Sequence, residues 1–370
     1  MTRPGAHGRD KRVVRQARPR RWQQGDSGRY MPGNGDVIGT MRRPVRLSGV
    51  SLVEMLVCLL LAMLIALIAI SLLVSSRATF SAQDNATRLL ETGLYALASI
   101  ERAIRQAGYE NWSAAGAALV ATPDMSPAIL GLDDRRLPDM PAALASAVAP
   151  GVNGSDVLAI RFFGSGDSNG SGAGNMLNCA GVAVAEPAAG DLDGGRGWSI
   201  FHIARNQAGQ SELRCKYRAR DGVNWDSESI APDIDAMQVL YGVDANGDGL
   251  PDRFVNASSL NNAIAMPALT PAVGNGLPLP ASTANPWNDV VAVRVSLLAR
   301  GPELLAASPV NKVFDFFGAE YSALMGHGDR GVRIGAAELG ADWQLRLRRL
   351  FSLTIPLRNR AGYKAATESP

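Results

Sequence analysis

The segment DANGDGLPD, residues 244–252, has the residue types and the spacing of a calcium-binding loop. Loops of the EF-hand type place oxygen ligands at positions 1, 3, 5, 7 and 9 and a glycine at position 6, where Gly249 stands here. The predicted ligands are Asp244, Asn246, Asp248, the carbonyl of Leu250, and Asp252, which binds directly or through water. Calcium is therefore the cofactor that the sequence indicates.

A second interpretation of this segment stays open. The bidentate Glu that completes an EF-hand loop at position 12 is missing, because Val255 stands there. Asp, Asn and Gly also form tight polar turns between strands without any metal. The segment is either a weak calcium site or a turn.

The three cysteines do not form a zinc motif, because none has Cys or His partners at zinc-binding spacing. Cys58 lies in an apolar run and is expected to act as a small apolar residue. Cys179 and Cys215 are expected to form a disulfide if that part of the chain is exported. The alternative is two unpaired thiols.

The segment GDSNG, residues 166–170, matches the G-x-S-x-G pattern of serine hydrolases around Ser168. A nucleophile elbow needs a helix directly after the serine, and here more Gly and Ser follow. Outside residues 1–49, only His202 and His327 could act as a general base. We interpret the segment as a Gly/Ser loop and predict that the protein is not an enzyme.

Glu54 is an acidic residue at the start of an apolar segment. Residues 55–74 carry no charge, and a helix of that length spans about 30 Å, the thickness of a bilayer core. A carboxylate in such a helix costs about 2–3 kcal/mol, so we expect Glu54 to have a function. Arg42, Arg43 and Arg46 precede the segment, so the N-terminus is predicted to be cytoplasmic and the bulk of the chain external.

Two common interpretations of this apolar segment each fail to explain one of its features. A cleaved signal peptide has a shorter apolar run and a small-residue cleavage site, for which residues 74–76 offer only a weak match. A plain signal anchor explains the length of the apolar run but not Glu54.

The N-terminal segment resembles the class III signal of type IV prepilins, because it combines a basic leader, Gly49, the residues VSLVE and the apolar run. The resemblance implies that a prepilin peptidase cleaves after Gly49 and methylates Val50, although Phe or Met is usual at that position. It also implies that Glu54 pairs with the N-terminal amine of a neighbouring subunit during assembly. A carboxylate is tolerated in lipid when a cation neutralises it.

The net positive charge of the chain comes from residues 1–49, the predicted leader. They hold 12 Lys or Arg and three Asp, a net charge of +9, which leaves −6 for the rest out of a total of +3. Met41 opens the compact leader MRRPVRLSG and is an alternative start. The acidic balance after the leader and the lack of a basic-aromatic stripe do not support nucleic-acid binding.

The elements that position these residues begin with one long helix. We expect residues 50–76 to cross the membrane and residues 77–108 to continue as an amphipathic helix that Gly108 caps. The predicted apolar face consists of Leu90, Leu94, Leu97, Ile100 and Ile104.

Residues 109–370 are predicted to form a β-rich globular domain. The predicted strands are residues 156–163, 181–186, 198–205, 212–219, 236–243, 289–299 and 350–357. No crossover helix follows these strands, which favours antiparallel pairing. Residues 112–155, 257–288 and 301–342 are expected to be loops or insertions. The predicted fold class is α+β, with the long N-terminal helix packed on a mostly antiparallel sheet.

Four segments resemble the PilW family of minor pilins: residues 88–109, 234–254, 288–300 and 347–360. The resemblance implies a type IV pilin fold and a non-catalytic subunit that helps to initiate pilus assembly in or near the tip. Implied partners are other minor and major pilins, the prepilin peptidase, the inner-membrane assembly platform and a PilY-type adhesin.

The same resemblance implies a location in the inner membrane before assembly, on the pilus or cell surface afterwards, and roles in adhesion and twitching motility. Two rivals remain. A minor pseudopilin of a type II secretion system carries the same N-terminal signal, and a membrane-anchored periplasmic enzyme would need a catalytic group of side chains.

Overall fold

The computed structural model describes residues 49, 51–112, 118–119, 125–138, 144, 147–166, 175–188, 190–219, 224–265, 285–304, 312–339 and 346–359. The chain divides into two compact units, residues 1–65 and 66–370, which we describe separately.

Helix α1 (Leu52–Gln106) is continuous over 55 residues, as the apolar pattern predicts. It begins after Ser51, whose carbonyl accepts a hydrogen bond from the backbone N–H of Met55 at 3.1 Å. It ends before Gly108, whose φ of 66° is a left-handed conformation that glycine adopts without strain. Gly108 therefore ends the helix as predicted.

The described part of the first unit is the start of α1. Every large apolar side chain of α1 in this unit is more than half exposed, and the same holds in the second unit as far as Val74. Among the described residues, α1 is the one helix that is long and apolar enough to cross a membrane.

In the second unit, α1 packs on the sheets through a face that includes Leu97, Ile100 and Ile104, as predicted, but not Leu90 and Leu94. The buried positions are Asn85, Leu89, Gly93, Ala96, Leu97, Ile100, Ala103 and Ile104. Leu90 and Leu94, which we expected on this face, are 36% and 59% exposed. Small residues allow closer approach to a sheet than leucine does, so the contact centres on Gly93 and Ala96 instead.

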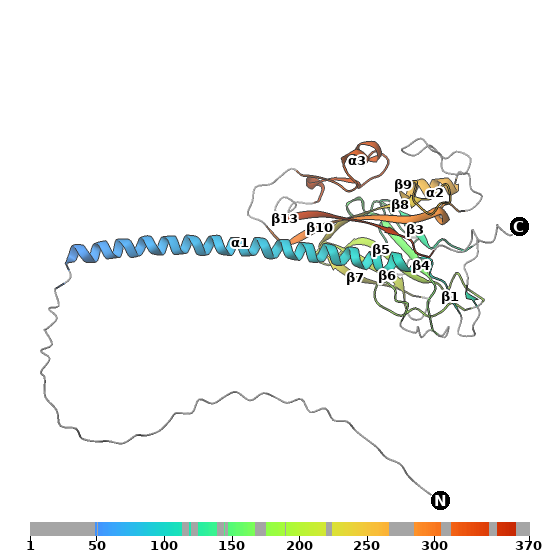
Figure 1. Cartoon of the computed structure of the whole chain (residues 1–370), viewed down its shortest axis with the longest axis horizontal. Helices are drawn as coiled ribbons and strands as arrows, with labels where there is room; N and C mark the ends of the chain where they lie inside the picture. The colour runs from blue at the N-terminus through green and yellow to red at the C-terminus, as the bar shows by residue number, and fades with distance from the viewer. Residues whose placement is uncertain are drawn as a thin grey trace, which may run out of the picture. The chain divides into compact units, whose positions relative to one another are not determined.

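Five antiparallel strands form one sheet of this unit. In spatial order they are β3 (Ile129–Leu132), β4 (Val157–Phe162), β5 (Gly197–Arg205), β6 (Ser211–Arg218) and β7 (Trp225–Pro232). Each strand pairs with its neighbour in sequence, so the sheet is a simple meander. Its apolar inner face packs against the C-terminal part of α1, drawn cyan in Figure 1.

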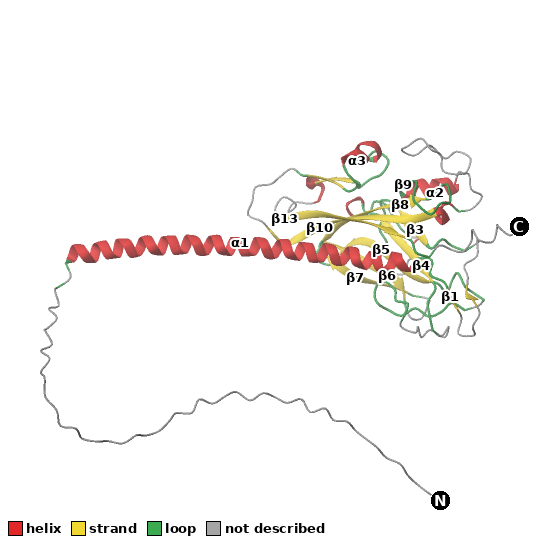
Figure 2. Cartoon of the chain, in the orientation of Figure 1, coloured by secondary structure: helices red, strands yellow, loops and turns green. Residues whose placement is uncertain are grey.

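A second antiparallel sheet has the order β13 (Arg346–Pro356), β10 (Val290–Leu304), β8 (Ile234–Val243) and β9 (Arg253–Val255). Two short hairpins accompany the sheets, β1 (Asn111–Trp112) with β2 (Ala118–Leu119), and β11 (Val313–Asp315) with β12 (Arg333–Gly335). Figure 2 shows the remaining helices in red, α2 (Ala257–Ala265) and α3 (Ala319–Met325).

A buried ion network joins the two sheets. Asp235 at the start of β8 accepts hydrogen bonds from Ser211 Oγ at 2.7 Å, Arg300 Nη1 at 2.9 Å and Arg348 Nε at 2.7 Å. These partners belong to β6, β10 and β13. A buried charge that loses its partner costs several kcal/mol, so the network fixes the relative positions of these strands.

The α+β prediction is confirmed, with a long N-terminal helix and antiparallel sheets. Six of the seven predicted strands are present. Residues 181–186 are not a strand, because Ala183 makes only an isolated bridge with Leu177. The expected loops contain further elements, among them β3, α2, the β11–β12 hairpin and α3. These elements are short, so their sequences do not show a clear apolar period.

Candidate functional site

The N-terminal site of the prediction lies at the start of α1. Gly49 is exposed, and Val50 falls outside the described residues. Glu54 lies in the first turn of α1, where the helix dipole favours an acidic side chain. It is exposed, and no cation of the described residues pairs with it. Its carboxylate is therefore available to a cation from outside the chain.

Cys179 and Cys215 are bonded in the structure, with their Cα atoms 5.9 Å apart. Cys215 is buried in β6, on the face that packs under α1. Cys179 lies in a tight turn, where the Asn178 side chain accepts the backbone N–H groups of Ala180 and Val182, each at 3.0 Å. The disulfide attaches this turn to the inner face of the five-stranded sheet.

The acidic loop after β8 is closed by hydrogen bonds to its own backbone. Asp244 is buried and accepts the N–H groups of Gly247 at 2.6 Å and Gly249 at 2.9 Å. Gly247 and Gly249 have φ values of 84° and 96°, which glycine adopts readily. Asp252 accepts the N–H group of Ala245 at 2.6 Å. The backbone thus turns its N–H groups toward the carboxylates.

The side chain of Asn246 connects the remaining carboxylates of this loop. Its Nδ2 lies 3.1 Å from Asp248 Oδ2 and 3.2 Å from Asp252 Oδ1. The side chains do converge, and their oxygen chemistry suits calcium. In this arrangement, however, the Asn246 amide presents its nitrogen, not its oxygen, to the carboxylates. In the described part of the chain, no group of three or more metal-binding side chains is placed to hold an ion.

The described residues that were considered for catalysis, His202 and His327, do not form a site. Ser168 lies outside the described residues, and His327 is exposed after α3. His202 on β5 is 2% exposed, and neither ring nitrogen has a hydrogen-bond partner among the described residues. Burial, with the charges of Lys216 and Arg214, lowers the pKa of His202 to about 3. The imidazole is therefore neutral at physiological pH and enclosed.

Three carboxylates that the sequence analysis did not single out are buried close to one another. Burial, and then the charges of Asp133 and Asp329, raise the pKa of Asp156 well above its usual value. Burial, and then the charge of Asp133, raise the pKa of Asp329 to about 7. The Tyr321 hydroxyl donates to Asp329 Oδ2 at 3.0 Å. Nothing in the local sequence marks these aspartates, because they come from separate loops.

One of the three carboxylates also serves a helix end. Asp133 accepts the first N–H groups of α2, from Ala257 at 3.0 Å and Ser258 at 2.7 Å. Burial raises the pKa of Asp133, and these N–H groups oppose the rise. The negatively charged form of Asp133 therefore interacts favourably with the N-terminus of α2.

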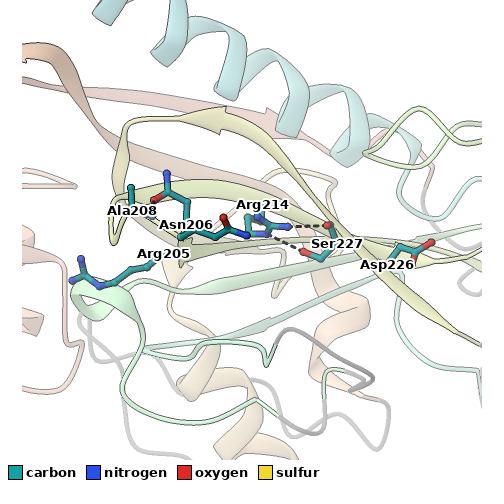
Figure 3. A pocket seen from close by; sticks show the side chains of 7 residues that line it. Arg205, Asn206, Ala208, Arg214, Asp226 and Ser227 are labelled. Carbon is teal, nitrogen blue, oxygen red and sulfur yellow. Dashed lines mark hydrogen bonds between the residues drawn. The ribbon is translucent and has the colours of Figure 1, made fainter.

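An open hollow of about 750 Å³ lies on the outer face of the five-stranded sheet. Its lining residues are Arg205, Asn206, Gln207, Ala208, Arg214, Asp226 and Ser227. Figure 3 shows Arg214 and Ser227 pointing toward one another, with hydrogen bonds of 3.1 Å to Ser227 Oγ and 2.8 Å to its carbonyl. Asp226 extends away from Arg214 in the same view. The guanidinium of Arg214 is thus held by the sheet, and the carboxylate of Asp226 has no hydrogen-bond partner among the described residues.

Comparison with known proteins connects part of this structure to a family. Residues 200–359 match the family model described as Type IV Pilus-assembly protein W, or PilW. The match covers most of β5 and the strands from β6 to β13. The resemblance to PilW is thereby confirmed over this part of the chain.

A solved structure, a type IV-like pilin from Thermus thermophilus, is similar to 56% of this chain over 81% of its own length. The sequence identity is 17% and the TM-score is 0.26. No curated protein sequence matches the chain. The description of the fold given above rests on the elements themselves.

Proposed function

We propose that this protein is a minor subunit of a type IV pilus that helps to initiate assembly and stays in or near the tip. The match of residues 200–359 to the PilW family carries the proposal. The long exposed apolar helix, with Glu54 in its first turn, supports an anchored subunit that packs against other helices in the membrane. In this proposal the protein has no catalytic role.

The partners in this proposal follow from the same features. Prepilin peptidase would cleave after Gly49 and methylate Val50, and the freed amine of a neighbouring pilin would neutralise Glu54. Other pilins, the inner-membrane platform and a PilY-type adhesin would contact the assembled subunit, which would move from the inner membrane to the pilus surface.

Glu54→Ala tests the proposal. The change makes the segment more apolar, so membrane insertion and leader removal should continue, while incorporation into pili should fall because the partner amine loses its counter-charge. Immunoblots of sheared pili and of membranes measure both steps. Normal incorporation would contradict the assigned role of Glu54.

A deletion strain distinguishes the pilus from a secretion system. Loss of surface pili and twitching with normal protein secretion is expected for a minor pilin. Loss of secretion with normal pili would identify a type II pseudopilin instead.

Calcium binding by the loop at residues 244–252 is a separate proposal. The ligand types support it, but binding would require the Asn246 amide to turn its oxygen inward and the carboxylates to exchange backbone N–H groups for the ion. Calcium at several millimolar should raise the melting temperature, because a ligand that binds only the folded state stabilises it. Asp248→Ala should lose this response. An unchanged melting temperature of the unaltered protein would leave the loop as a turn.

A further inference from the structure

Strand β7 is a free edge of the five-stranded sheet. It pairs with β6 on one side, and on the other side it pairs with no strand of the described residues. The next strand in sequence, β8, belongs to the other sheet. A free edge presents backbone N–H and C=O groups to any extended chain that aligns with it.

The sequence of β7, WDSESIAP, has two carboxylates, and its other protective features lie at one end of the strand. It contains no lysine, and its one proline is the last residue, Pro232. The irregularity in its pairing with β6 lies near Leu213, at the same end. Residues 225–229 therefore form a regular open edge.

Two exposed carboxylates mark this edge. Asp226 and Glu228 stand opposite Tyr217 and Cys215 of β6, so both side chains lie on the face that packs under α1. The Tyr217 hydroxyl donates to Glu228 Oε1 at 2.8 Å. Asp226 has no hydrogen bond or ion pair with the described residues. The edge is therefore acidic.

A hollow lies on each face of the sheet beside β7. On the α1 side, a groove of about 280 Å³ is lined by Tyr95 and Arg102 of α1, the turn at residues 177–181, and residues 228–230 of β7. On the other face lies the open hollow of Figure 3, at residues 226–227. Successive side chains of an added strand point to opposite faces, so each hollow can receive one of them.

We propose that the free edge of β7 binds an extended segment of a partner protein that carries Lys or Arg at alternate positions. Backbone hydrogen bonds along the edge supply affinity, as in other complexes formed by strand addition. Basic side chains on the α1 side then face Asp226 and Glu228, and opposite charges across strands attract. Arg102 lines the groove beside Glu228, whereas Asp226 lies outside the groove, so the attraction of a basic side chain is expected mainly at Asp226. A second copy of β7 would instead bring carboxylate against carboxylate.

The proposal goes beyond a role in pilus assembly and is tested by peptide binding to the full chain in detergent. The first probe is a fluorescent heptapeptide, Thr-Lys-Val-Lys-Val-Lys-Thr. The second has Glu in place of each Lys, and the third has the same composition as the first with the three Lys adjacent. Only the first should bind measurably, and hydrogen exchange at residues 225–229 should slow when it does.

Asp226→Lys is the decisive variant, since Asp226 is exposed and has no hydrogen bond with another described residue. We expect its affinity for the alternating Lys peptide to fall about fivefold or more, because one attractive cross-strand pair becomes repulsive. Glu320→Lys, the same charge change at an exposed position of α3, should keep the original affinity.

Three results would overturn the proposal. Equal affinity of the two variants would place the peptide elsewhere. Equal binding of the peptide with adjacent Lys would show non-specific charge attraction. Dimerisation of the protein alone that Asp226→Lys abolishes would make a second copy the occupant.

Discussion

At the residue scale, the approach of α1 to the four-stranded sheet is set by a glycine. A Cβ atom placed on Gly93 would lie 2.4 Å from Cε2 of the Phe351 ring, well inside contact distance. Ala96 and Ala103 continue the same small-residue face of the helix. The phenyl ring of β13 therefore fills the space that a side chain at position 93 would need.

Gly93→Val should destabilise the protein by about 1–3 kcal/mol, because overpacking a close contact forces ring and helix apart. The free energy of unfolding in urea, measured on the full chain in detergent, checks this. Ala98→Val is the matched control, since Ala98 is exposed on the same helix. Equal stability of the two variants would show that the Phe351 ring moves aside freely.

Asp329 makes the stability of the protein depend on pH. Its pKa is about 7 in the folded protein, above the usual 3.8, chiefly because it is buried and then because Asp133 is near. The folded state therefore holds the proton more tightly than the unfolded state, and stability falls as pH rises from about 4 to about 7. Asp133 and Asp156 shift in the same direction.

Asp329→Asn removes the ionisable group and keeps the shape. Its melting temperature should change less between pH 5 and pH 7.5 than that of the unaltered protein. Tyr321→Phe is a useful comparison, because it removes the hydroxyl that donates to Asp329 but leaves the carboxylate buried. A steeper pH dependence in Asp329→Asn would contradict the assignment.

At the scale of elements, the disulfide is the connection that can be broken chemically. The two cysteines are 36 residues apart in sequence, and closing a loop of this size stabilises by about 3–4 kcal/mol on the chain-entropy model. The Cys179→Ser, Cys215→Ser double variant should lose about that much stability in urea.

Thiol labelling of protein from cells checks the oxidation state directly. Cys179 and Cys215 should react only after reduction, whereas Cys58 is exposed and unpaired, so it should react in both conditions once the protein is in detergent. Labelling of all three without reductant would show that the pair is open in the cell.

The sequence predicted the elements with strong periodic patterns and missed those without them. The apolar run and the helical spacing indicate α1, and β-branched or aromatic residues with partial alternation indicate β4, β5, β6, β8, β10 and β13. Strand β7 was missed because an edge strand with one covered face has too few apolar residues to stand out. The buried face of α1 was predicted correctly at Leu97, Ile100 and Ile104 but not at Leu90 and Leu94, because the contact there uses Leu89, Gly93 and Ala96.

At the scale of the whole molecule, much of the candidate site could be predicted because it consists of local motifs. Gly49 and Glu54 are read directly from a contiguous segment, and the acidic loop has a fixed internal spacing. The group of Asp133, Asp156 and Asp329 could not be predicted, since three separate loops bring these residues together. A single sequence does not show which residues far apart in the chain come together in the fold.

The mature protein should begin at Val50 with a methylated amine. Mass spectrometry of the N-terminal peptide from membranes measures this, and Gly49→Ala should leave the leader attached. An N-terminus at residue 76 or 77 would instead identify an ordinary signal peptide and contradict the prepilin assignment.

The contact between Gly93 and Phe351 can form only late in translation. A ribosome adds about 5–20 residues per second, so the 258 residues between these positions take roughly 13–50 s. Asn359, which donates to the carbonyls of Arg105 and Ala107, is made later still. For that interval the four-stranded sheet lacks β13, and only the five-stranded sheet, complete at Pro232, can cover the inner face of α1. The part of α1 around Gly93 therefore stays without its β13 contact for most of translation, which is a period when a chaperone can bind it.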